Sequence, residues 1–190
     1  MNNKEHKLVE RAKQGDRQAF GKLVKKYQNK VLYLAYDFVG NYYDAQDVAQ
    51  NSFLSAFQKI NSFRDEATFS TWIYRITTNA AIDFQRSKKR KNAMSLNQPA
   101  YDDGDLELID TLRDTDQPVD KKIEDGDLKN LVANLVELLS PQQRAAFILK
   151  HFHEKSTAEI AEILECDPIT VRGHILRATQ KLRKKLKGEK

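Results

Sequence analysis

The chain has 190 residues, and its 32 Lys and Arg against 27 Asp and Glu give a net charge of +5. One cysteine, Cys166, excludes an internal disulfide and a cysteine-based zinc site, and it fits a reducing compartment. The longest apolar run, Val31 to Tyr36, is far shorter than the ~18 residues that a membrane span needs. The polar N-terminus lacks the apolar core of a signal peptide. We therefore expect a soluble cytoplasmic protein of one or two domains, without membrane insertion.

Elements predicted in the first half of the chain are all helical. Periodicity predicts a short helix over Lys4–Gln14, closed by Gly15, and a second helix that Asp16 opens and that ends near Gly40. A third helix is expected to be capped by Asp44. No period-two alternation indicates a strand. The apolar positions expected to face the core are Phe20, Leu23, Val24, Tyr27, Val31, Leu34, Ala35 and Phe38, then Ala45, Val48, Ala49, Phe53, Ala56, Phe57 and Ile60.

A fourth helix is predicted over Phe69–Lys91, after a polar loop and with Ser70 or Thr71 as its cap. Beside its apolar stripe, a second stripe repeats every three or four residues, and a basic run follows. An aromatic platform next to a basic run suits an unstacked nucleic acid strand, although an ordinary amphipathic helix with a charged end remains an alternative. The second stripe consists of Trp72, Arg75, Asn79, Asp83 and Arg86.

The middle of the chain differs in composition. Between Asp102 and Asp127 there are eleven acidic side chains and three basic ones, with few large apolar residues. Such a segment cannot easily form its own core, so we expect a flexible linker with one short helical turn around Leu106–Leu112. The positive charge therefore lies in the two ends of the chain, which suggests that both contact a polyanion.

Helical signals resume at Leu128. Ser140-Pro141-Gln142-Gln143 is a helix start, and the capping box Ser156-Thr157-Ala158-Glu159 opens a short helix. A three-residue turn, Glu165–Asp167, separates it from a longer helix that begins at Pro168. This order is typical of a helix-turn-helix, and the alternative is a helical hairpin with a basic tail. The expected core positions are Leu128, Leu131, Val132, Leu135, Leu138, Leu139, Val171, Ile175, Ala178, Leu182 and Leu186.

The last helix offers side chains for two kinds of DNA contact. Near its start, an arginine can pair bidentately with guanine in the major groove. Near its end, lysines suit phosphate contacts that position the domain without reading sequence. The groove-facing residues are Thr170, Arg172, Gly173, Leu176 and Arg177, with His174 alongside, and the phosphate candidates are Lys181, Arg183, Lys184, Lys185 and Lys187.

Taken together in this order and spacing, the motifs are similar to those of the extracytoplasmic-function (ECF, RpoE-like) sigma factors of the sigma-70 family, over nearly the whole chain. The motifs are Ala19-Phe20-x-x-Leu23-Val24-x-x-Tyr27, Asp44-Ala45-x-Asp47-Val48-x-Gln50-x-x-Phe53-x-x-Ala56-Phe57, Phe69-Ser70-Thr71-Trp72-Ile73-Tyr74-Arg75-Ile76-x-x-Asn79, Leu138-x-x-Pro141-x-x-Arg144, Glu159-Ile160-Ala161-Glu162-Ile163-Leu164 and Thr170-Val171-Arg172 through Arg177-Ala178 to Leu182.

The resemblance implies a promoter-specificity subunit of RNA polymerase with no catalysis, metal or cofactor of its own. It implies an all-α fold of two small helical domains: sigma region 2 over 1–93, an acidic linker over 94–127 and sigma region 4 over 128–190. The implied partners are core RNA polymerase, through the clamp coiled coil of its largest catalytic subunit, promoter DNA and an anti-sigma factor. Asp47 and Gln50 are the implied polymerase contacts, Trp72, Arg75, Asn79 and Arg86 the −10 contacts, and Thr170, Arg172, Gly173, Leu176 and Arg177 the −35 contacts.

Several positions depart from the family pattern, among them His174 and Gly173, which stand where the family often has Arg or Lys and Ser. Trp72-Ile73 replaces two adjacent aromatics of primary sigma factors, which implies weaker melting and stricter promoter dependence. Glu165 stands where glycine is usual, so it is expected to adopt a left-handed conformation at a cost of order 1 kcal/mol. Cys166 replaces an aliphatic residue and is interpreted as a small buried hydrophobe.

The same residues leave two other classes of function open. One is a free-standing regulator that binds DNA through the helix-turn-helix alone. The other is a metal-dependent nuclease using Asp44, Asp47 and Asp83, for which no further ligand has recognisable spacing.

Overall fold

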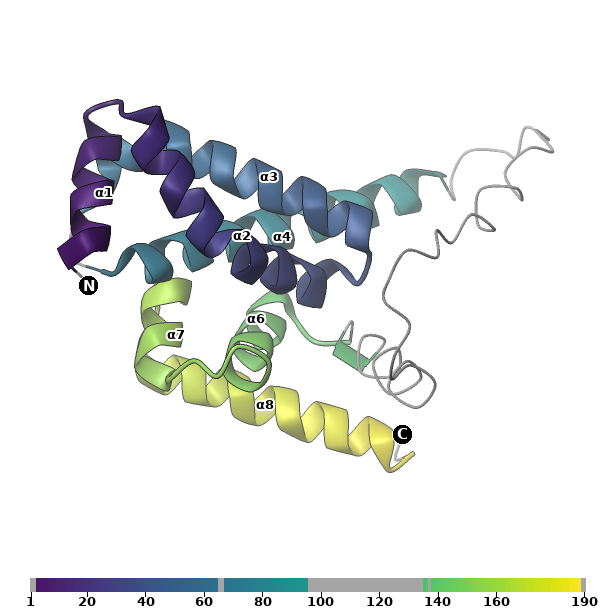
Figure 1. Cartoon of the computed structure of the whole chain (residues 1–190). Helices are drawn as coiled ribbons and strands as arrows, with labels where there is room; N and C mark the ends of the chain where they lie inside the picture. The colour runs from purple at the N-terminus through teal and green to yellow at the C-terminus, as the bar shows by residue number, and fades with distance from the viewer. Residues whose placement is uncertain (1–2, 65–66, 96–134, 137, 189–190) are drawn as a thin grey trace, which may run out of the picture.

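All regular structure is helical in the computed structural model, which describes residues 3–64, 67–95, 135–136 and 138–188. The all-α prediction is therefore confirmed. Two helical units lie against each other: an N-terminal unit of residues 3–95 and a C-terminal unit formed by the described residues from 135 onward (Figure 1). The predicted linker and its helical turn at 106–112 lie outside the described residues.

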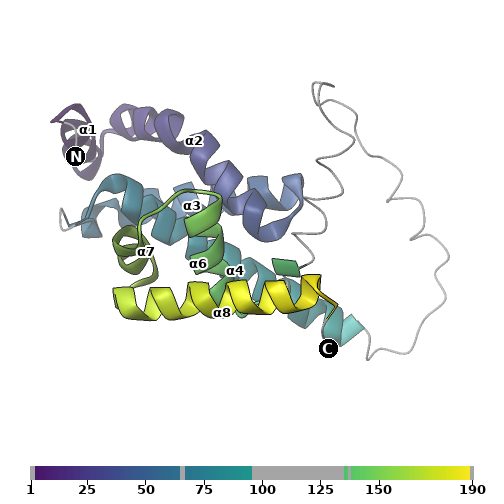
Figure 2. The ribbon, with the colours of Figure 1, turned by 90° about the horizontal axis from the view of Figure 1, so that it is seen from below.

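The N-terminal unit contains four α-helices, whose order follows the prediction. They are α1 (Asn3–Lys13), α2 (Arg17–Val39), α3 (Tyr42–Lys59) and α4 (Phe69–Ser95), with a 3-10 turn at Ile60–Ser62. The C-terminal unit contains α6 (Pro141–His151), α7 (Thr157–Leu164) and α8 (Pro168–Leu186). Helix α8 runs along the outside of this unit, with α6 and α7 between it and the N-terminal unit (Figure 1), and it crosses α4 in the view from below (Figure 2).

Local signals define the ends of α2. Asp16 accepts hydrogen bonds from the backbone N–H groups of Gln18 (2.9 Å) and Ala19 (3.0 Å), and Gly40 closes the helix at φ 72°. A left-handed cap of this kind costs glycine little because it has no Cβ. Both signals were predicted from the sequence, and both are confirmed.

The predicted caps of the next two helices are wrong by one turn or less. Asn41, not Asp44, caps α3 by accepting the N–H of Asp44 at 3.1 Å. Before α4, the Thr68 hydroxyl accepts the N–H of Thr71 at 3.1 Å, so neither Ser70 nor Thr71 is the cap. In both cases several Asx, Ser or Thr residues lie within one turn of the helix start, and all of them favour a cap.

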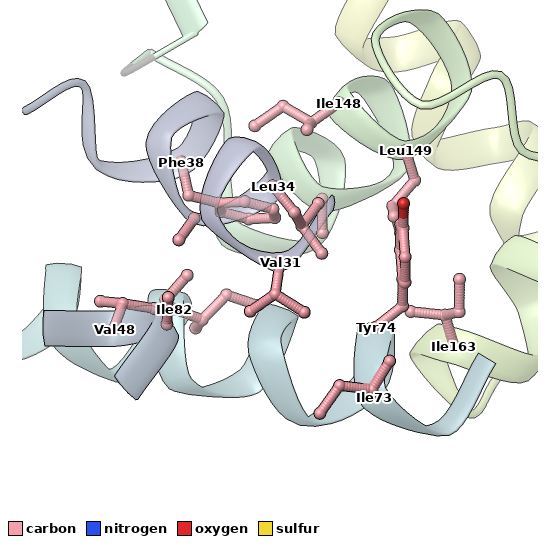
Figure 3. Packing of buried hydrophobic residues seen from close by; sticks show 14 of the residues in the cluster. Val31, Leu34, Phe38, Val48, Ile73, Tyr74, Ile82, Ile148, Leu149 and Ile163 are labelled. Atoms are coloured by element: carbon pink, nitrogen blue, oxygen red, sulfur yellow. The ribbon is translucent and has the colours of Figure 1, made fainter. Parts of the chain in front are cut away.

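One hydrophobic core extends through both units. Leu23, Val31, Leu34 and Ile73 are fully buried in the N-terminal unit. In Figure 3 the Tyr74 ring of α4 points toward the C-terminal unit, near Leu149 and Ile163. Because apolar contacts continue from one unit to the other, removal of this shared surface from water stabilises the closed arrangement.

Three predicted core positions are exposed instead. Phe57 is 37 % exposed at the surface of α3, Leu138 is 43 % exposed and Leu186 is 61 % exposed. Leu138 lies in a turn before α6, where helical periodicity does not apply. Leu186 is the last residue of α8, at its exposed C-terminal end. The predicted positions Leu128, Leu131 and Val132 lie outside the described residues.

Candidate nucleic-acid and polymerase interfaces

The helix-turn-helix is built by three successive local signals. Ser156 and Glu159 form a reciprocal capping box at the start of α7: Glu159 N–H donates to the Ser156 hydroxyl at 3.2 Å, and Ser156 N–H donates to the Glu159 carboxylate at 2.9 Å. The bond from Ser156 is the main cause that lowers the pKa of Glu159 to about 2. Glu165 ends α7 in the left-handed conformation, at φ 53° and ψ 46°, as the sequence predicted. Pro168 then begins α8 at a position that needs no N–H donor.

Helix α8 presents the predicted groove-facing residues on its outer side. Thr170, Arg172, Leu176 and Arg177 are exposed, while Val171, Ala178 and Leu182 are buried on the opposite side. Gly173 is half-buried, and a Cβ added there would meet no atom within 4 Å. Within the described part of the chain, the outer side of α8 is therefore uncovered and can contact another molecule. Two guanidinium groups lie on this side.

His174 and Lys181 have more structural roles than the sequence indicated. Burial lowers the pKa of the half-buried His174, and the nearby Arg177 charge adds to this effect, so both favour the neutral imidazole. Lys181 donates to the carbonyl of Leu138 at 2.6 Å, which ties α8 to the segment before α6. The basic residues of the last turn of α8, Arg183, Lys184 and Lys185, remain exposed and suited to phosphate.

The predicted −10 residues on α4 lie in different environments. Trp72 is half-buried, with its ring 5.1 Å from that of Phe63 and 5.6 Å from that of Phe69. It is therefore partly embedded in an aromatic cluster rather than standing free as a platform. Asn79 and Arg86 are exposed further along α4, and Arg86 pairs with Asp83 at 3.4 Å.

Arg75 contacts the C-terminal unit, which the sequence did not indicate. Its Nη1 donates to Glu165 Oε1 at 2.7 Å, and its Nη2 donates to the carbonyl oxygen of Glu162 at 2.6 Å. The Arg75 side chain is 28 % exposed, against 63 % for that of Glu165. Arg75 also lines a shallow recess between α4 and the helix-turn-helix together with Cys166, which is half-buried and has its thiol pKa raised mainly by burial.

A second polar contact joins the units through His153. Its Nε2 lies 2.9 Å from Asp37 Oδ2 of α2, and its Nδ1 lies 3.5 Å from the hydroxyl of Tyr74 on α4. Nearby, the buried Arg144 donates to the carbonyls of Val136 (3.0 Å) and Phe38 (3.5 Å). Neither His153 nor Asp37 was singled out from the sequence, because their pairing depends on contact between distant segments.

The predicted polymerase-binding residues lie on the outer side of α3. Asp47 and Gln50 are both exposed, one turn apart. Asp44 lies in the first turn of the same helix and pairs with Lys88 of α4 at 2.8 Å. Within residues 3–64, 67–95, 135–136 and 138–188, no group of His, Cys, Asp and Glu could hold a metal ion, so the nuclease interpretation of Asp44, Asp47 and Asp83 gains no support.

Exposed aromatic residues at the junction of α2 and α3 are a feature that sequence reasoning missed. Their spacing mixes them with core positions, which hides them in the periodic pattern. The set is Tyr33, Tyr36, Tyr42 and Tyr43. None of the helices in the described part of the chain is both long enough and apolar enough to cross a membrane.

Both helical units match families of known proteins. The profile of Sigma-70 region 2 matches residues 23–91, and that of Sigma-70 region 4 matches residues 129–182. The chain is 36 % identical to the ECF RNA polymerase sigma-E factor of Haemophilus influenzae, over 94 % of this chain and 93 % of that protein. It is 35 % identical to the RNA polymerase sigma-H factor of Pseudomonas aeruginosa (96 % and 93 %) and 34 % identical to the ECF RNA polymerase sigma factor SigW of Bacillus subtilis (95 % and 96 %).

Solved structures share the fold. CnrH in complex with the cytosolic domain of CnrY matches with a TM-score of 0.66 at 22 % identity, over 99 % of this chain and 100 % of that one. The sigma factor RpoE from Bartonella quintana, in complex with the anti-sigma factor NepR, matches with a TM-score of 0.63 at 20 % identity (90 % and 98 %). The two Sigma-70 profiles and the relatives at 34–36 % identity show that this chain belongs to the ECF group of the sigma-70 family, whose members are DNA-binding transcription initiation factors.

Proposed function

We propose that this sigma factor directs promoter-specific initiation by binding core RNA polymerase through α3 and two promoter elements through α4 and α8. The observation that carries the proposal is that α4 and α8 each place exposed cationic and amide side chains on one side, on two separate helical units. The proposed division into region 2 (1–93), linker (94–127) and region 4 (128–190) follows these units.

On α3, Asp47 and Gln50 are the proposed contacts to the clamp coiled coil of the largest catalytic subunit. Their exposure on a rigid helix supports this role, since neither is required to fill the core. On α4, Trp72, Arg75, Asn79 and Arg86 are the proposed −10 contacts. A partly embedded Trp72 can stack on one base at its exposed side, while the exposed Asn79 amide can read a base edge.

On α8, Thr170, Arg172, Gly173, Leu176 and Arg177 are the proposed −35 contacts. The arginines can form bidentate hydrogen bonds to guanine, and Leu176 can contact a thymine methyl group. Each element alone is expected to bind weakly. When both are held on one polymerase, the second contact becomes intramolecular, and the two modest sites act as one strong site.

The proposal includes an anti-sigma partner, a cytoplasmic location and no catalytic activity. The relatives CnrH and RpoE were solved with the cytosolic domain of CnrY and with the anti-sigma factor NepR, which supports a comparable partner here. A protein that works as a polymerase subunit must lie in the compartment that holds the polymerase and the chromosome. The polymerase supplies all the chemistry of transcription.

Run-off transcription with purified bacterial core polymerase and a promoter library tests this function. The expected result is transcripts that require both proteins and that come from templates sharing two elements, one near −10 and one near −35. Binding of the chain to duplex DNA with no effect on core polymerase, and no co-purification with it, would instead favour a free-standing helix-turn-helix regulator.

A further inference from the structure

The contact between Arg75 and the helix-turn-helix joins two surfaces that were assigned separate roles. Arg75 belongs to the proposed −10 face of α4, whereas Glu165 is the first residue of the turn before the recognition helix. They are 90 positions apart in the chain, and their side chains meet at 2.7 Å. The second guanidinium nitrogen donates to the backbone carbonyl of Glu162 at 2.6 Å. Both terminal nitrogens of Arg75 therefore already have acceptors within the protein.

The backbone at Glu165 is independently unusual. Its φ of 53° lies in the left-handed region, which glycine adopts readily and a residue with a Cβ adopts at a cost. A glycine would relieve this strain, but it would provide no carboxylate to reach Arg75. Strain that persists at one position is a reason to seek a function for its side chain. The bond to Arg75 is such a function.

An arginine that is already paired has fewer donors to offer a nucleic acid. A phosphate or a base acceptor must displace the Glu165 carboxylate and the Glu162 carbonyl before it can bind both nitrogens of Arg75. The recess that Arg75 lines is also bounded by Ala158, Ala161 and Cys166 of the C-terminal unit, so a strand that follows α4 would meet this unit.

We propose that Glu165 forms an autoinhibitory contact, in which its carboxylate occupies Arg75 in the closed free protein and competes with the −10 strand. The inference rests on the proposed −10 role of Arg75. The free chain is then a closed form with low affinity for the −10 strand. Any event that separates the two units, such as binding of each to a different part of the polymerase, releases Arg75 for DNA. Contact with the promoter then depends on prior assembly of the sigma factor with the polymerase.

Other contacts between the units limit the size of the effect. His153 and Asp37 remain paired at 2.9 Å, and Tyr74 still packs near Leu149 and Ile163 (Figure 3). Loss of the Glu165 carboxylate should therefore shift the balance toward the open form without separating the units completely. Because this ion pair is partly exposed, we expect about a threefold to tenfold change in strand affinity.

The first experiment measures binding of the full chain to a fluorescein-labelled single-stranded decanucleotide that carries the −10 element selected by run-off transcription. Glu165→Gln should bind about threefold to tenfold more tightly than the wild type. Glu162→Gln is the matched control, since it removes the same charge from an exposed side chain three residues earlier but keeps the carbonyl that contacts Arg75. Equal affinities of the two variants would overturn the proposal.

The second experiment measures closure without DNA. Nitroxide labels on Lys25→Cys of α2 and Gln180→Cys of α8, both exposed, report the distance between the units in a Cys166→Ala background. The wild-type background should give one narrow distance, and Glu165→Gln should add a longer component, which Glu162→Gln does not. Identical distributions in all three would overturn the proposal.

A third variant separates this inference from the function on which it rests. If Arg75→Ala binds the decanucleotide as tightly as the wild type, Arg75 is not a −10 contact and the competition with DNA is excluded. The distance measurement would then still report whether Glu165 holds the units together. If Arg75→Ala loses affinity while Glu165→Gln gains none, the −10 role stands and the autoinhibitory contact is wrong.

Discussion

Arg75 and Asn79 lie one turn apart on the same helix and yet meet different surroundings. The Arg75 guanidinium is paired with the C-terminal unit, whereas the Asn79 amide is exposed to solvent. Unlike Arg75, Asn79 is therefore available to contact a base in the closed form. The amide carries both a donor and an acceptor, which is what recognition of a base edge requires.

Asn79→Ala should lower transcription from a cognate promoter and leave core binding unchanged. The expected loss of discrimination at one −10 base is about 1–3 kcal/mol, because a pair of hydrogen bonds to a base edge is removed. Run-off assays on templates premelted around −10 measure it, with each base varied in turn. Asn29→Ala, an exposed amide on α2, is the control. Identical base preference in wild type and Asn79→Ala would exclude base reading.

Glu159 provides a test of the capping box through pH. Its pKa is lowered to about 2 from the usual 4.5 of a glutamate, first by the N–H of Ser156 and also by Lys155, which pairs with it at 3.0 Å. A carboxyl group whose pKa is lower in the folded state stabilises the fold above its unfolded pKa, and this contribution disappears as pH falls through the folded pKa.

Glu159→Gln keeps an oxygen that can accept the Ser156 N–H but removes the charge. Its melting temperature should therefore lie below that of the wild type at pH 7, and the difference should shrink as pH falls from about 4.5 toward 2. Circular dichroism melts at a series of pH values measure this. Glu162→Gln, on the same helix, should show a smaller difference at every pH. A Glu159→Gln difference that does not change with pH would contradict the assigned cause.

At the scale of the element, the features that the sequence predicts best are those determined by residues close together in the chain. The capping boxes at Ser140 and Ser156 and the left-handed Glu165 were all predicted, because each depends on residues within one turn. The cap of α3 was misplaced because Asn41 and Asp44 both suit that role, and chain preference alone does not choose between them.

Contacts between elements could not be predicted in the same way. Arg75 reaches Glu165 across 90 positions, and His153 reaches Asp37 across 116. Helical periodicity places each side chain on a face but does not say which distant helix covers that face. The same reason explains why the sequence did not indicate the bond from Lys181, a predicted phosphate contact, to the carbonyl of Leu138.

Helix α8 is predicted to read sequence at its start and bind phosphate at its end. Arg172→Ala and Arg177→Ala should each cost about 1–3 kcal/mol of discrimination at one base pair. Lys184→Ala, in the last turn, should weaken binding evenly on all promoters and reduce the salt slope by about one unit. A panel of −35 mutants measured at several salt concentrations distinguishes the two effects. Uniform losses with the arginine variants would show that the groove placement is wrong.

For the whole molecule, the proposed polymerase surface lies on α3, on the side of the N-terminal unit away from the C-terminal unit (Figure 1). Asp47→Lys and Gln50→Lys should each weaken binding to core polymerase, by about tenfold or more if the added charge meets a like charge, and leave the melting temperature unchanged. Fluorescence anisotropy with labelled protein measures this affinity. Gln58→Lys, an exposed change at the other end of α3, is the control. Unchanged affinity in both test variants would remove this surface from the interface.

The order in which the chain is synthesised bears on the Arg75–Glu165 pair. The ribosome completes α4 before any part of α7 exists, and at about 5–20 residues per second the intervening 90 residues take about 5–18 s. Small helical units fold in milliseconds or less, so the N-terminal unit can fold while the rest of the chain is still being translated. During those seconds the nascent chain contains Arg75 but does not yet contain its partner Glu165. The newest copies of the protein are thus briefly the least restrained ones, because the Arg75–Glu165 contact cannot form before α7 and the turn after it have been made.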